Sequence, residues 1–275
     1  MPELPEVETV KRTLSPHLIG KTIITCENIR GEVIKHPDAM GYAAAVSGRR
    51  IEELGRRGKY LLIRLDSGDS IVVHLRMTGR LLYAEAAHPR QKHTHVVMHL
   101  DDGCELRFCD TRRFGCLWLL GKDEEDSFTG MQNLGIEPFD EQFSAAYLQQ
   151  HLGKRKITAK QGILDQAVLA GLGNIYADEA LFAAGVHPQK PCTQVTAEQW
   201  QKLAEAIPPI LRSSIANNGT TFNDYRDGEG KEGANLPFLQ AYGRGGQPCR
   251  RCGALLAKTR VGGRGTVFCP ICQPE

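Results

Sequence analysis

The sequence lacks several features that would place it outside the ordinary globular proteins. No apolar run approaches the roughly 20 residues that a membrane-spanning helix needs. No internal repeat is visible, and the opening MPELPEVETV carries three glutamates and no apolar core, unlike a secretion signal. We therefore expect a protein without a membrane partner, built from a core that 275 residues can readily bury.

The chain also lacks a disulfide framework and a strong net charge. Five cysteines outside the C-terminal region (Cys26, Cys104, Cys109, Cys116 and Cys192) are odd in number and irregular in spacing, so we expect free thiols in a reducing cytosol. The net charge is only +2, so any nucleic-acid surface must be local. Basic clusters occur at Arg56, Arg57 and Lys59, and at Lys154, Arg155, Lys156 and Lys160. A solvated surface is the alternative for either cluster.

The C-terminal cysteines form two C-x-x-C pairs. The pairs are Cys249 with Cys252 and Cys269 with Cys272, and 16 residues separate them. This spacing is typical of a zinc ribbon, in which each pair supplies two thiolates to a tetrahedral zinc ion. We expect one structural Zn²⁺ at these four residues.

The segment around these cysteines contains only positive charge. Residues 240–272 include Arg244, Arg250, Arg251, Lys258, Arg260 and Arg264, and no Asp or Glu. A metal-stabilised hairpin of this kind favours contact with nucleic-acid phosphates, and a solvated basic surface is the alternative.

Periodicity predicts an α+β fold. A helix is expected to start at Pro5, followed by strands at 59–65, 71–77, 81–83, 95–100, 105–109 and 116–120. Together they predict an N-terminal helix plus an antiparallel β-sandwich domain over residues 1–132. Helices expected at 141–151, 160–168, 175–184 and 197–217 predict a helical domain over 133–239, with a glycine-rich loop at 217–236. Residues 240–275 form the zinc-ribbon hairpin, with its tip at 261–264.

The N-terminus offers a nucleophile. Pro2 is small enough for Met1 to be removed, which would leave a secondary amine with a pKa near the α-amino value of about 8. Such an amine attacks a sugar C1′ to give an iminium that cannot lose a proton from nitrogen, and Glu3 is the adjacent acid or base. The alternative is that both residues only lead into the helix.

Three motifs resemble those of bacterial formamidopyrimidine-DNA glycosylase. They are Pro2-Glu3-Leu4-Pro5-Glu6-Val7-Glu8-Thr9, the segment Gly171-Leu172-Gly173-Asn174-Ile175-Tyr176, and Tyr242-Gly243-Arg244 followed by the cysteine pairs. The resemblance covers the whole chain. It implies a bifunctional base-excision repair enzyme, probing double-stranded DNA as a monomer in the bacterial cytosol and nucleoid. Such an enzyme removes oxidised purines (8-oxoguanine and formamidopyrimidines) and cleaves the abasic strand by β,δ-elimination. The helical domain would then be a helix–two-turn–helix domain with a lesion-recognition loop.

The resemblance also implies residue roles. Pro2 is the Schiff-base nucleophile, Glu3 the general acid and base, and Lys59 assists base removal. Asn174 and Arg264 grip a phosphate, with Arg264 as proton donor in the elimination, and His74 is a weaker candidate for phosphate contact. Met77, Arg112 and Phe114 fill the space left by the flipped nucleotide.

Two alternatives stay open at this point. An endonuclease VIII-like glycosylase for oxidised pyrimidines shares the amine and the zinc finger, although Leu4, Arg112 and Phe114 favour the purine enzyme. A non-catalytic zinc-ribbon DNA-binding protein would explain the cysteines and basic clusters, but neither Pro2-Glu3 nor the two distant motifs.

Overall fold

The computed structural model describes residues 1–275, which fold into two compact units. The first, here called the N-terminal unit, comprises residues 1–132 together with 217–234. The second, the C-terminal unit, comprises residues 133–216 and 235–275. The chain therefore returns once to the N-terminal unit, for most of the glycine-rich segment, before it completes the C-terminal unit.

The N-terminal unit consists of one long helix, one short helix and a large sheet. The helices are α1 (Leu4–Leu18) and α2 (Ala39–Val46), with a short 3-10 helix η1 (Gly31–Val33). The strands are β1 (Thr22–Asn28), β2 (Ile34–His36), β3 (Arg49–Arg57), β4 (Tyr60–Leu65), β5 (Ser70–His74), β6 (Gly79–Glu85), β7 (Thr94–Leu100), β8 (Cys104–Asp110) and β9 (Cys116–Leu120). They pair in the order β2-β9-β5-β4-β3-β1-β7-β8-β6.

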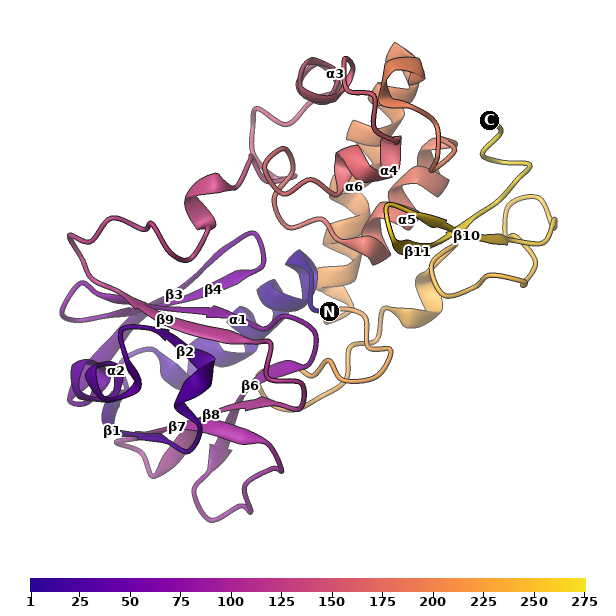
Figure 1. Ribbon diagram of the computed structural model, residues 1–275. Coiled ribbons are helices and arrows are strands. Elements are labelled where there is room, and N and C mark those ends of the chain that lie inside the picture. Colours follow the sequence, from indigo (N-terminus) through magenta and orange to yellow (C-terminus); the bar gives the residue numbers. More distant parts are fainter. The chain divides into compact units, whose positions relative to one another are not determined.

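This sheet bends into two layers that enclose one core. Figure 1 shows β3, β4 and β9 in one layer and β1, β7 and β8 in the other. Alternating side chains of both layers, such as Ile63 and Phe108, are fully buried and pack together with Val10 of α1. All pairings are antiparallel except β2 with β9. The predicted fold class, an antiparallel sandwich behind one helix, is confirmed.

The sequence prediction differs from the structure in detail. The strand expected to reach residue 77 ends at His74, because Arg76 adopts φ +53° and the backbone N–H of Gly79 donates to the carbonyl of Leu75. Strand β3 was not located at all. Its sequence RRIEELGRR has few apolar residues, so the pattern that indicates a buried strand is weak.

The C-terminal unit contains four α-helices and a two-stranded hairpin. The helices are α3 (Ala145–Leu152), α4 (Ala159–Ile163), α5 (Asn174–Ala184) and α6 (Ala197–Ala216), and the 3-10 helices are η2 (Met131–Asn133) at the unit boundary, η3 (Cys192–Gln194) and η4 (Leu236–Phe238). None of the helices combines the length and apolarity that crossing a membrane requires. Helix α6 starts after Thr196, whose hydroxyl accepts the N–H of Gln199, as a capping residue does. The helix expected over 160–168 is wrong beyond Ile163, because the chain turns at Asp165.

The hairpin pairs β10 (Ala257–Val261) with β11 (Arg264–Phe268), and Figure 1 shows it in yellow. Gly262 and Gly263 form its two-residue turn with φ +55° and +77°, a conformation that only glycine adopts without strain in both positions. Val261 and Arg264 are the last paired residues, so Arg264 stands at the tip, as the sequence predicted.

Candidate functional site

The N-terminal residues are fixed where helix α1 begins. Glu3 is the N-cap of this helix and is only 2% exposed, and Pro2 is buried as well. The backbone N–H of Glu3 donates to Oε2 of Glu6 over 2.9 Å, which forms half of a capping box. The positive end of the helix dipole lies here, and it stabilises a carboxylate. An amine at Pro2 and the carboxylate of Glu3 would therefore occupy an ordered, largely dehydrated place.

Lys59 lies in the turn between β3 and β4 and is 7% exposed. A chain of contacts connects this turn to helix α1. Arg56 donates from its guanidinium to the carbonyl of Gly58 over 3.0 Å and to Oε2 of Glu8 over 3.0 Å. Burial would raise the pKa of Glu8, but hydrogen bonds from Lys11, Arg56 and Arg12 outweigh it and lower that pKa. Glu8 therefore stays ionised and holds the turn that carries Lys59.

His74 ends strand β5 and is a neutral side chain. Burial, together with the positive charges of Arg76 and Lys59, lowers its pKa from 6.5 to about 3. Its Nδ1 accepts the backbone N–H of Arg76 over 3.0 Å, so the ring proton resides on Nε2. His74 can therefore donate a hydrogen bond to an anion such as a phosphate, but it adds no charge.

A buried carboxylate joins the loops that carry the three expected void-filling residues. Asp110 is fully buried, and its carboxylate accepts the Thr78 hydroxyl from the β5–β6 loop. It also accepts the backbone N–H of Arg112 over 3.1 Å and that of Gly115 over 2.7 Å, both in the β8–β9 loop. The N–H of Arg112 donates to the Thr78 hydroxyl as well, over 3.1 Å. No sequence pattern indicates that Asp110 organises both loops.

Large side chains project from these loops into solvent. Met77 is 41% exposed and Phe114 is 53% exposed, although both are apolar. The guanidinium of Arg112 lies 4.8 Å from the centre of the Phe114 ring, which orients the two residues together. Exposed apolar side chains on loops held this firmly are typical of a surface that inserts into a partner.

Sequence reasoning missed a cationic pocket in the same unit. It has a volume of about 300 Å³ and no acidic lining residue. The lining residues are Arg30, Lys92, His93, Thr94, His95 and Arg113. They come from three separate segments without a common motif, so no sequence pattern announces the pocket. Arg113 adjoins Arg112, which makes the pocket continuous with the β8–β9 loop.

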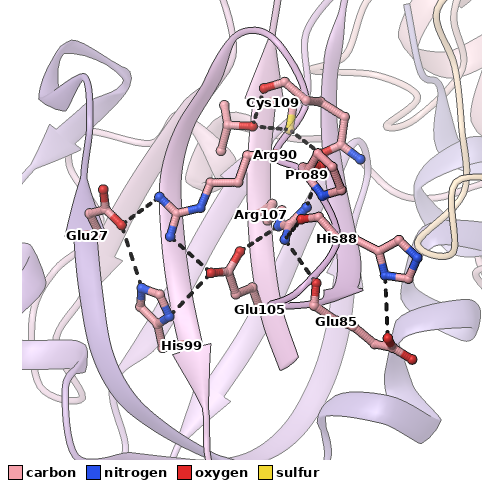
Figure 2. Close-up of polar contacts among 11 residues, drawn as sticks. Glu27, Glu85, His88, Pro89, Arg90, His99, Glu105, Arg107 and Cys109 are labelled. Carbon is pink, nitrogen blue, oxygen red and sulfur yellow. Dashed lines mark hydrogen bonds and ion pairs between the residues drawn. The ribbon is translucent and has the colours of Figure 1, made fainter. Parts of the chain in front are cut away.

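A buried arginine fastens the loop that leads to this pocket. Arg107 on β8 is fully buried and donates to Oε2 of Glu105 over 2.6 Å. The other end of its guanidinium donates to the carbonyls of Glu85, His88 and Pro89, over 3.0, 2.8 and 3.3 Å. Figure 2 shows this set, with Arg90 joining Glu105 to Glu27 across the sheet. Because Arg107 binds three carbonyls of the β6–β7 loop, this loop is held to the sheet.

The glycine-rich segment is anchored in its own unit. Thr220, Thr221 and Tyr225 of this segment are all buried, at 3%, 8% and 7% exposure. Residues 222–224 between them are exposed, with Phe222 at 41%, and so are residues 229–232 further along the segment. The three buried residues therefore hold the segment in place and leave residues 222–224 available to a ligand.

In the C-terminal unit, two side chains of helix α5 bind the backbone of the β10–β11 hairpin. The side-chain amide of Asn174 donates to the carbonyl of Gly265 over 3.0 Å. One turn further, Oδ2 of Asp178 accepts the backbone N–H of Val267 over 2.9 Å. Arg264, which precedes Gly265 in the chain, is exposed. Asn174 thus binds the residue next to Arg264, which brings these two expected phosphate-binding residues near each other.

A buried ion pair reinforces this contact. Lys160 and Asp178 are fully buried and their charged atoms lie 2.6 Å apart. Lys160 also donates to the hydroxyl of Thr266 over 2.8 Å. Burial raises the pKa of Asp178 to about 6, and Lys160 counteracts this rise. Lys160 was assigned to a basic surface cluster from the sequence. That assignment is wrong, because its ammonium is buried and binds Asp178 and Thr266.

The next residue of α5, Glu179, fixes the start of the zinc module, by which we mean residues 240–275. The carboxylate of Glu179 accepts three consecutive backbone N–H groups, those of Gln240, Ala241 and Tyr242, each over 2.8 Å. Burial raises the pKa of Glu179, although these three donors oppose the rise. Consecutive acids on one helix therefore hold both ends of the module that follows.

The four C-terminal cysteines converge. Their sulfur atoms lie within 4.8 Å of one another. Cys249 and Cys272 are 4.0 Å apart, and Cys252 and Cys269 are 3.5 Å apart. A tetrahedral zinc ion with Zn–S bonds of 2.3 Å requires sulfur atoms about 3.8 Å apart, so the donor set fits zinc. Backbone N–H groups of Arg251 and Cys272 point at sulfur atoms over 3.4 Å, as they do toward thiolate ligands.

Comparison with known proteins gives a consistent result over the whole chain. Sequence models match for the formamidopyrimidine-DNA glycosylase N-terminal domain at residues 1–117, its H2TH domain at 134–226, and a zinc finger found in FPG and IleRS at 246–274. The formamidopyrimidine-DNA glycosylase of Pelotomaculum thermopropionicum is 46% identical over 273 residues, or 99% of each chain.

Solved structures agree with these matches. A Lactococcus lactis FPG mutant in complex with Fapy-dG containing DNA has a TM-score of 0.93 and 35% identity, covering 100% of both chains. The Lactococcus lactis Fpg bound to an abasic site containing DNA also has a TM-score of 0.93 at 35% identity, covering 99% of this chain and 100% of that one.

Proposed function

The chain belongs to the formamidopyrimidine-DNA glycosylase family of base-excision DNA-repair enzymes, and on this premise we propose that it removes oxidised purines and then cleaves the abasic strand. The observation that carries the proposal is the buried, ordered start of α1, where Glu3 directly follows Pro2. Removal of Met1 would place the Pro2 amine directly beside this buried carboxylate, an arrangement that suits catalysis at a sugar.

The proposed reaction begins at the sugar of a flipped nucleotide. Once Met1 is removed, the lone pair of the Pro2 nitrogen attacks C1′, and the bond from C1′ to the base breaks with its electron pair going to the base, which takes up a proton. Glu3 protonates the ring oxygen as the sugar opens, which leaves an iminium between Pro2 and C1′. The buried setting of Glu3 suits a group that exchanges a proton with the sugar and not with water.

Strand cleavage follows from the iminium as an electron sink. Loss of a proton from C2′ sends an electron pair toward the 3′ carbon and expels the 3′ phosphate. Loss of a second proton, from C4′, expels the 5′ phosphate in the same way. Water then hydrolyses the iminium, which restores the Pro2 amine and releases the sugar remnant as an unsaturated aldehyde. Arg264 is proposed to donate the proton to a departing phosphate and to bind it, since a guanidinium donates two parallel hydrogen bonds.

The remaining residues are assigned by chemistry and placement. Lys59 is proposed to assist base removal from its buried turn. His74 is proposed to donate its neutral Nε2–H to a DNA phosphate, because its Nδ1 already accepts the backbone N–H of Arg76. Asn174 is proposed to support the Arg264 phosphate site through its bond to the Gly265 carbonyl. Because these groups differ in charge, Arg264 contributes to the salt dependence of DNA binding and His74 does not.

Met77, Arg112 and Phe114 are proposed to occupy the duplex where the damaged nucleotide leaves. An unbranched thioether and an aromatic ring are suitable wedges, and Arg112 can bind the edge of the unpaired base. Support comes from their exposure and from the Asp110 contacts that join their loops. The adjoining cationic pocket adds a place for a phosphate of the same duplex.

The cofactor and the setting complete the proposal. One zinc ion at Cys249, Cys252, Cys269 and Cys272 is structural, because four protein ligands leave no open position for chemistry. The three sequence domains (1–132, 133–239 and 240–275) are proposed to act as one monomer on duplex DNA. Five unpaired cysteines outside the zinc site, together with the four zinc-site thiols, support a place in the bacterial cytosol and nucleoid.

The test uses a duplex with a single 8-oxoguanine opposite cytosine, with and without borohydride. Reduction of the iminium should give a covalent protein–DNA complex, and the untreated reaction should leave a gap with phosphates at both ends. Retention of Met1 should abolish the complex. Preference for an oxidised-pyrimidine duplex would move the chain to the endonuclease VIII-like activity, and binding without cleavage would leave only the DNA-binding claim.

A further inference from the structure

A single carboxylate in the N-terminal unit connects the segment of Pro2 and Glu3 with the glycine-rich segment. Glu6 is 1% exposed. Its Oε2 accepts the backbone N–H of Glu3 over 2.9 Å, and its Oε1 accepts the backbone N–H of Thr220 over 2.9 Å. One oxygen thus holds the segment of the nucleophile and the acid, and the other holds the glycine-rich segment.

The glycine-rich segment makes further contacts with the same residue. The hydroxyl of Tyr225 donates to the carbonyl of Glu6 over 3.4 Å and to that of Asn218 over 3.1 Å. Gly219 has φ +80°, and a Cβ there would lie 3.1 Å from Cγ and 3.2 Å from Oε1 of Glu6. The segment can approach the carboxylate so closely because this position is glycine.

The far end of the segment is fastened independently. The backbone N–H of Gly228 donates to the Thr13 hydroxyl over 2.9 Å, and its carbonyl accepts the N–H of Tyr83 over 2.9 Å. Between the two attachments, residues 222–224 are exposed. A ligand that contacts and displaces these exposed residues would therefore also displace the backbone at the two attachments. One of these attachments is the carboxylate of Glu6, which also binds the Glu3 backbone.

We propose that Glu6 is a positioning residue that couples occupancy of the 217–234 segment to the alignment of Pro2 and Glu3. The inference rests on the proposed function and on the lesion-recognition role that the family resemblance implies for the glycine-rich segment. The two oxygens belong to one rigid group, so a displacement of the Thr220 N–H changes the best position of Oε1 and, with it, of Oε2 and the Glu3 backbone. Binding of a base then favours the catalytic geometry, and the coupling is reciprocal.

The coupling predicts a difference between the two reactions of one enzyme. Base excision requires a base on the segment, so it depends on Glu6. Cleavage of a preformed abasic strand offers no base, so it proceeds with the segment unoccupied and gains little from the coupling. A residue that only stabilised the fold would lower both rates together.

The main variant is Glu6→Gln. The amide keeps one acceptor oxygen, but its nitrogen is a donor and cannot accept, so either the Glu3 or the Thr220 N–H loses its partner. Single-turnover rates would be measured at saturating protein on an 8-oxoguanine duplex and on a preformed abasic duplex. We expect the excision rate to fall by about tenfold, because a buried N–H that loses its acceptor no longer holds Glu3 or Thr220 in place. Abasic cleavage should stay within about threefold of the unsubstituted protein.

A second variant covers the possibility that Glu6→Gln does not fold. Tyr225→Phe keeps the ring in the core but removes the hydroxyl that contacts the Glu6 carbonyl, so it should give the same split with a smaller loss of excision. The matched control is Glu105→Gln, which neutralises another buried carboxylate of the same unit, in the network of Figure 2. Its stability should fall, but the ratio of the two rates should not change.

The outcomes separate the inference from the function beneath it. Equal losses of excision and abasic cleavage in Glu6→Gln, or in Tyr225→Phe if the first variant is unfolded, would overturn the coupling, as would no loss in either. An unsubstituted protein that forms no borohydride complex with abasic DNA would instead remove the proposed function. A complex that forms normally while the split is absent contradicts the coupling alone.

Discussion

The two units hold their functional side chains by different means. In the N-terminal unit, two sheet layers and α1 share one large apolar core, and the loops are then fixed by single carboxylates such as Asp110 and Glu6. In the C-terminal unit, the zinc module has a core of only five buried residues (Phe182, Ala241, Cys249, Leu256 and Cys269). Its tip residue Arg264 therefore depends on metal, on the buried pair of Lys160 with Asp178, and on Glu179.

The difference shows what a small module needs in order to aim one side chain. Apolar burial stabilises by area and does not prescribe direction, whereas a metal ion and an ion pair fix distances and angles. The N-terminal unit can tolerate the loss of one contact, because many others remain. The zinc module has few, so each should matter more.

The strongest test of this contrast is removal of zinc. Structural zinc contributes on the order of 10 kcal/mol to the folding of such modules. Chelation, or Cys269→Ser, should disorder β10 and β11 and reduce affinity for duplex DNA by about a hundredfold, because the Arg264 phosphate site is lost. Calorimetry should still show the unfolding transition of the N-terminal unit unchanged. A common loss of both transitions would mean that the units do not differ as described.

A smaller effect is expected for Lys160→Met. The variant leaves the charge of Asp178 buried without its cation, which costs about 3–5 kcal/mol. The loss should shrink at lower pH. Burial already raises the pKa of Asp178 to about 6, so the folded state binds a proton more readily than the unfolded one and gains stability as pH falls. Urea unfolding at several pH values measures this.

The double variant Lys160→Met with Asp178→Asn provides the control for the ion pair. It removes both charges, so it should recover part of the stability that the single variant loses. If the double variant is as unstable as the single one at every pH, the cost lies in packing and not in the uncompensated charge.

Asp110→Asn probes the corresponding carboxylate of the N-terminal unit. Its new amide nitrogen would face the N–H of Arg112 or Gly115, and we expect a loss of about 1–3 kcal/mol in unfolding free energy. Excision from a lesion duplex should fall more than the stability alone explains, since the loops of Met77 and Phe114 lose their common support. Asp101→Asn, at an exposed site on the same unit, is the matched control. Equal excision by both variants would argue against a role for this support.

At neutral pH the smallest effect is expected at His74, because its contribution appears only in acid. Its pKa is 6.5 when exposed and about 3 in the folded state, so below pH 6.5 the unfolded chain binds a proton that the folded chain refuses. Stability is therefore complete above pH 6.5 and falls as pH drops toward 3, by at most about 1.4 kcal/mol per pH unit from this group. His74→Gln should flatten the profile over this window. An unchanged slope would show that His74 is protonated in the folded protein.

Local motifs explain what could be read from the sequence. The cysteine spacing, the glycine pair of the hairpin turn and the Pro2-Glu3 opening each specify their geometry within a few residues. The hairpin tip and the convergence of the cysteines were accordingly predicted correctly. The fold class followed from alternation along the strands, where each layer presents one face to the core.

Contacts between distant residues explain what could not be read. Asp110 meets Thr78, and Glu6 meets Thr220, across separations that no periodicity encodes. Lys160 is the instructive error, because a lysine beside other basic residues usually lies in solvent. Its burial depends on Asp178 of α5 and on Thr266 of the hairpin, both distant from it in the sequence. The roles of individual catalytic residues stay predictions until the rates above are measured.

The return of residues 217–234 to the first unit has a consequence for the order of synthesis. A ribosome finishes residues 1–132 long before it reaches Tyr225, and it makes residues 133–216 in between. The core of the N-terminal unit includes the Tyr225 ring, so this core is incomplete throughout that interval. The nascent chain must keep an apolar opening beside α1 unfilled while the first helices of the next unit emerge. The enzyme can therefore acquire its closed N-terminal unit only late in translation, when most of the helical part has already been made.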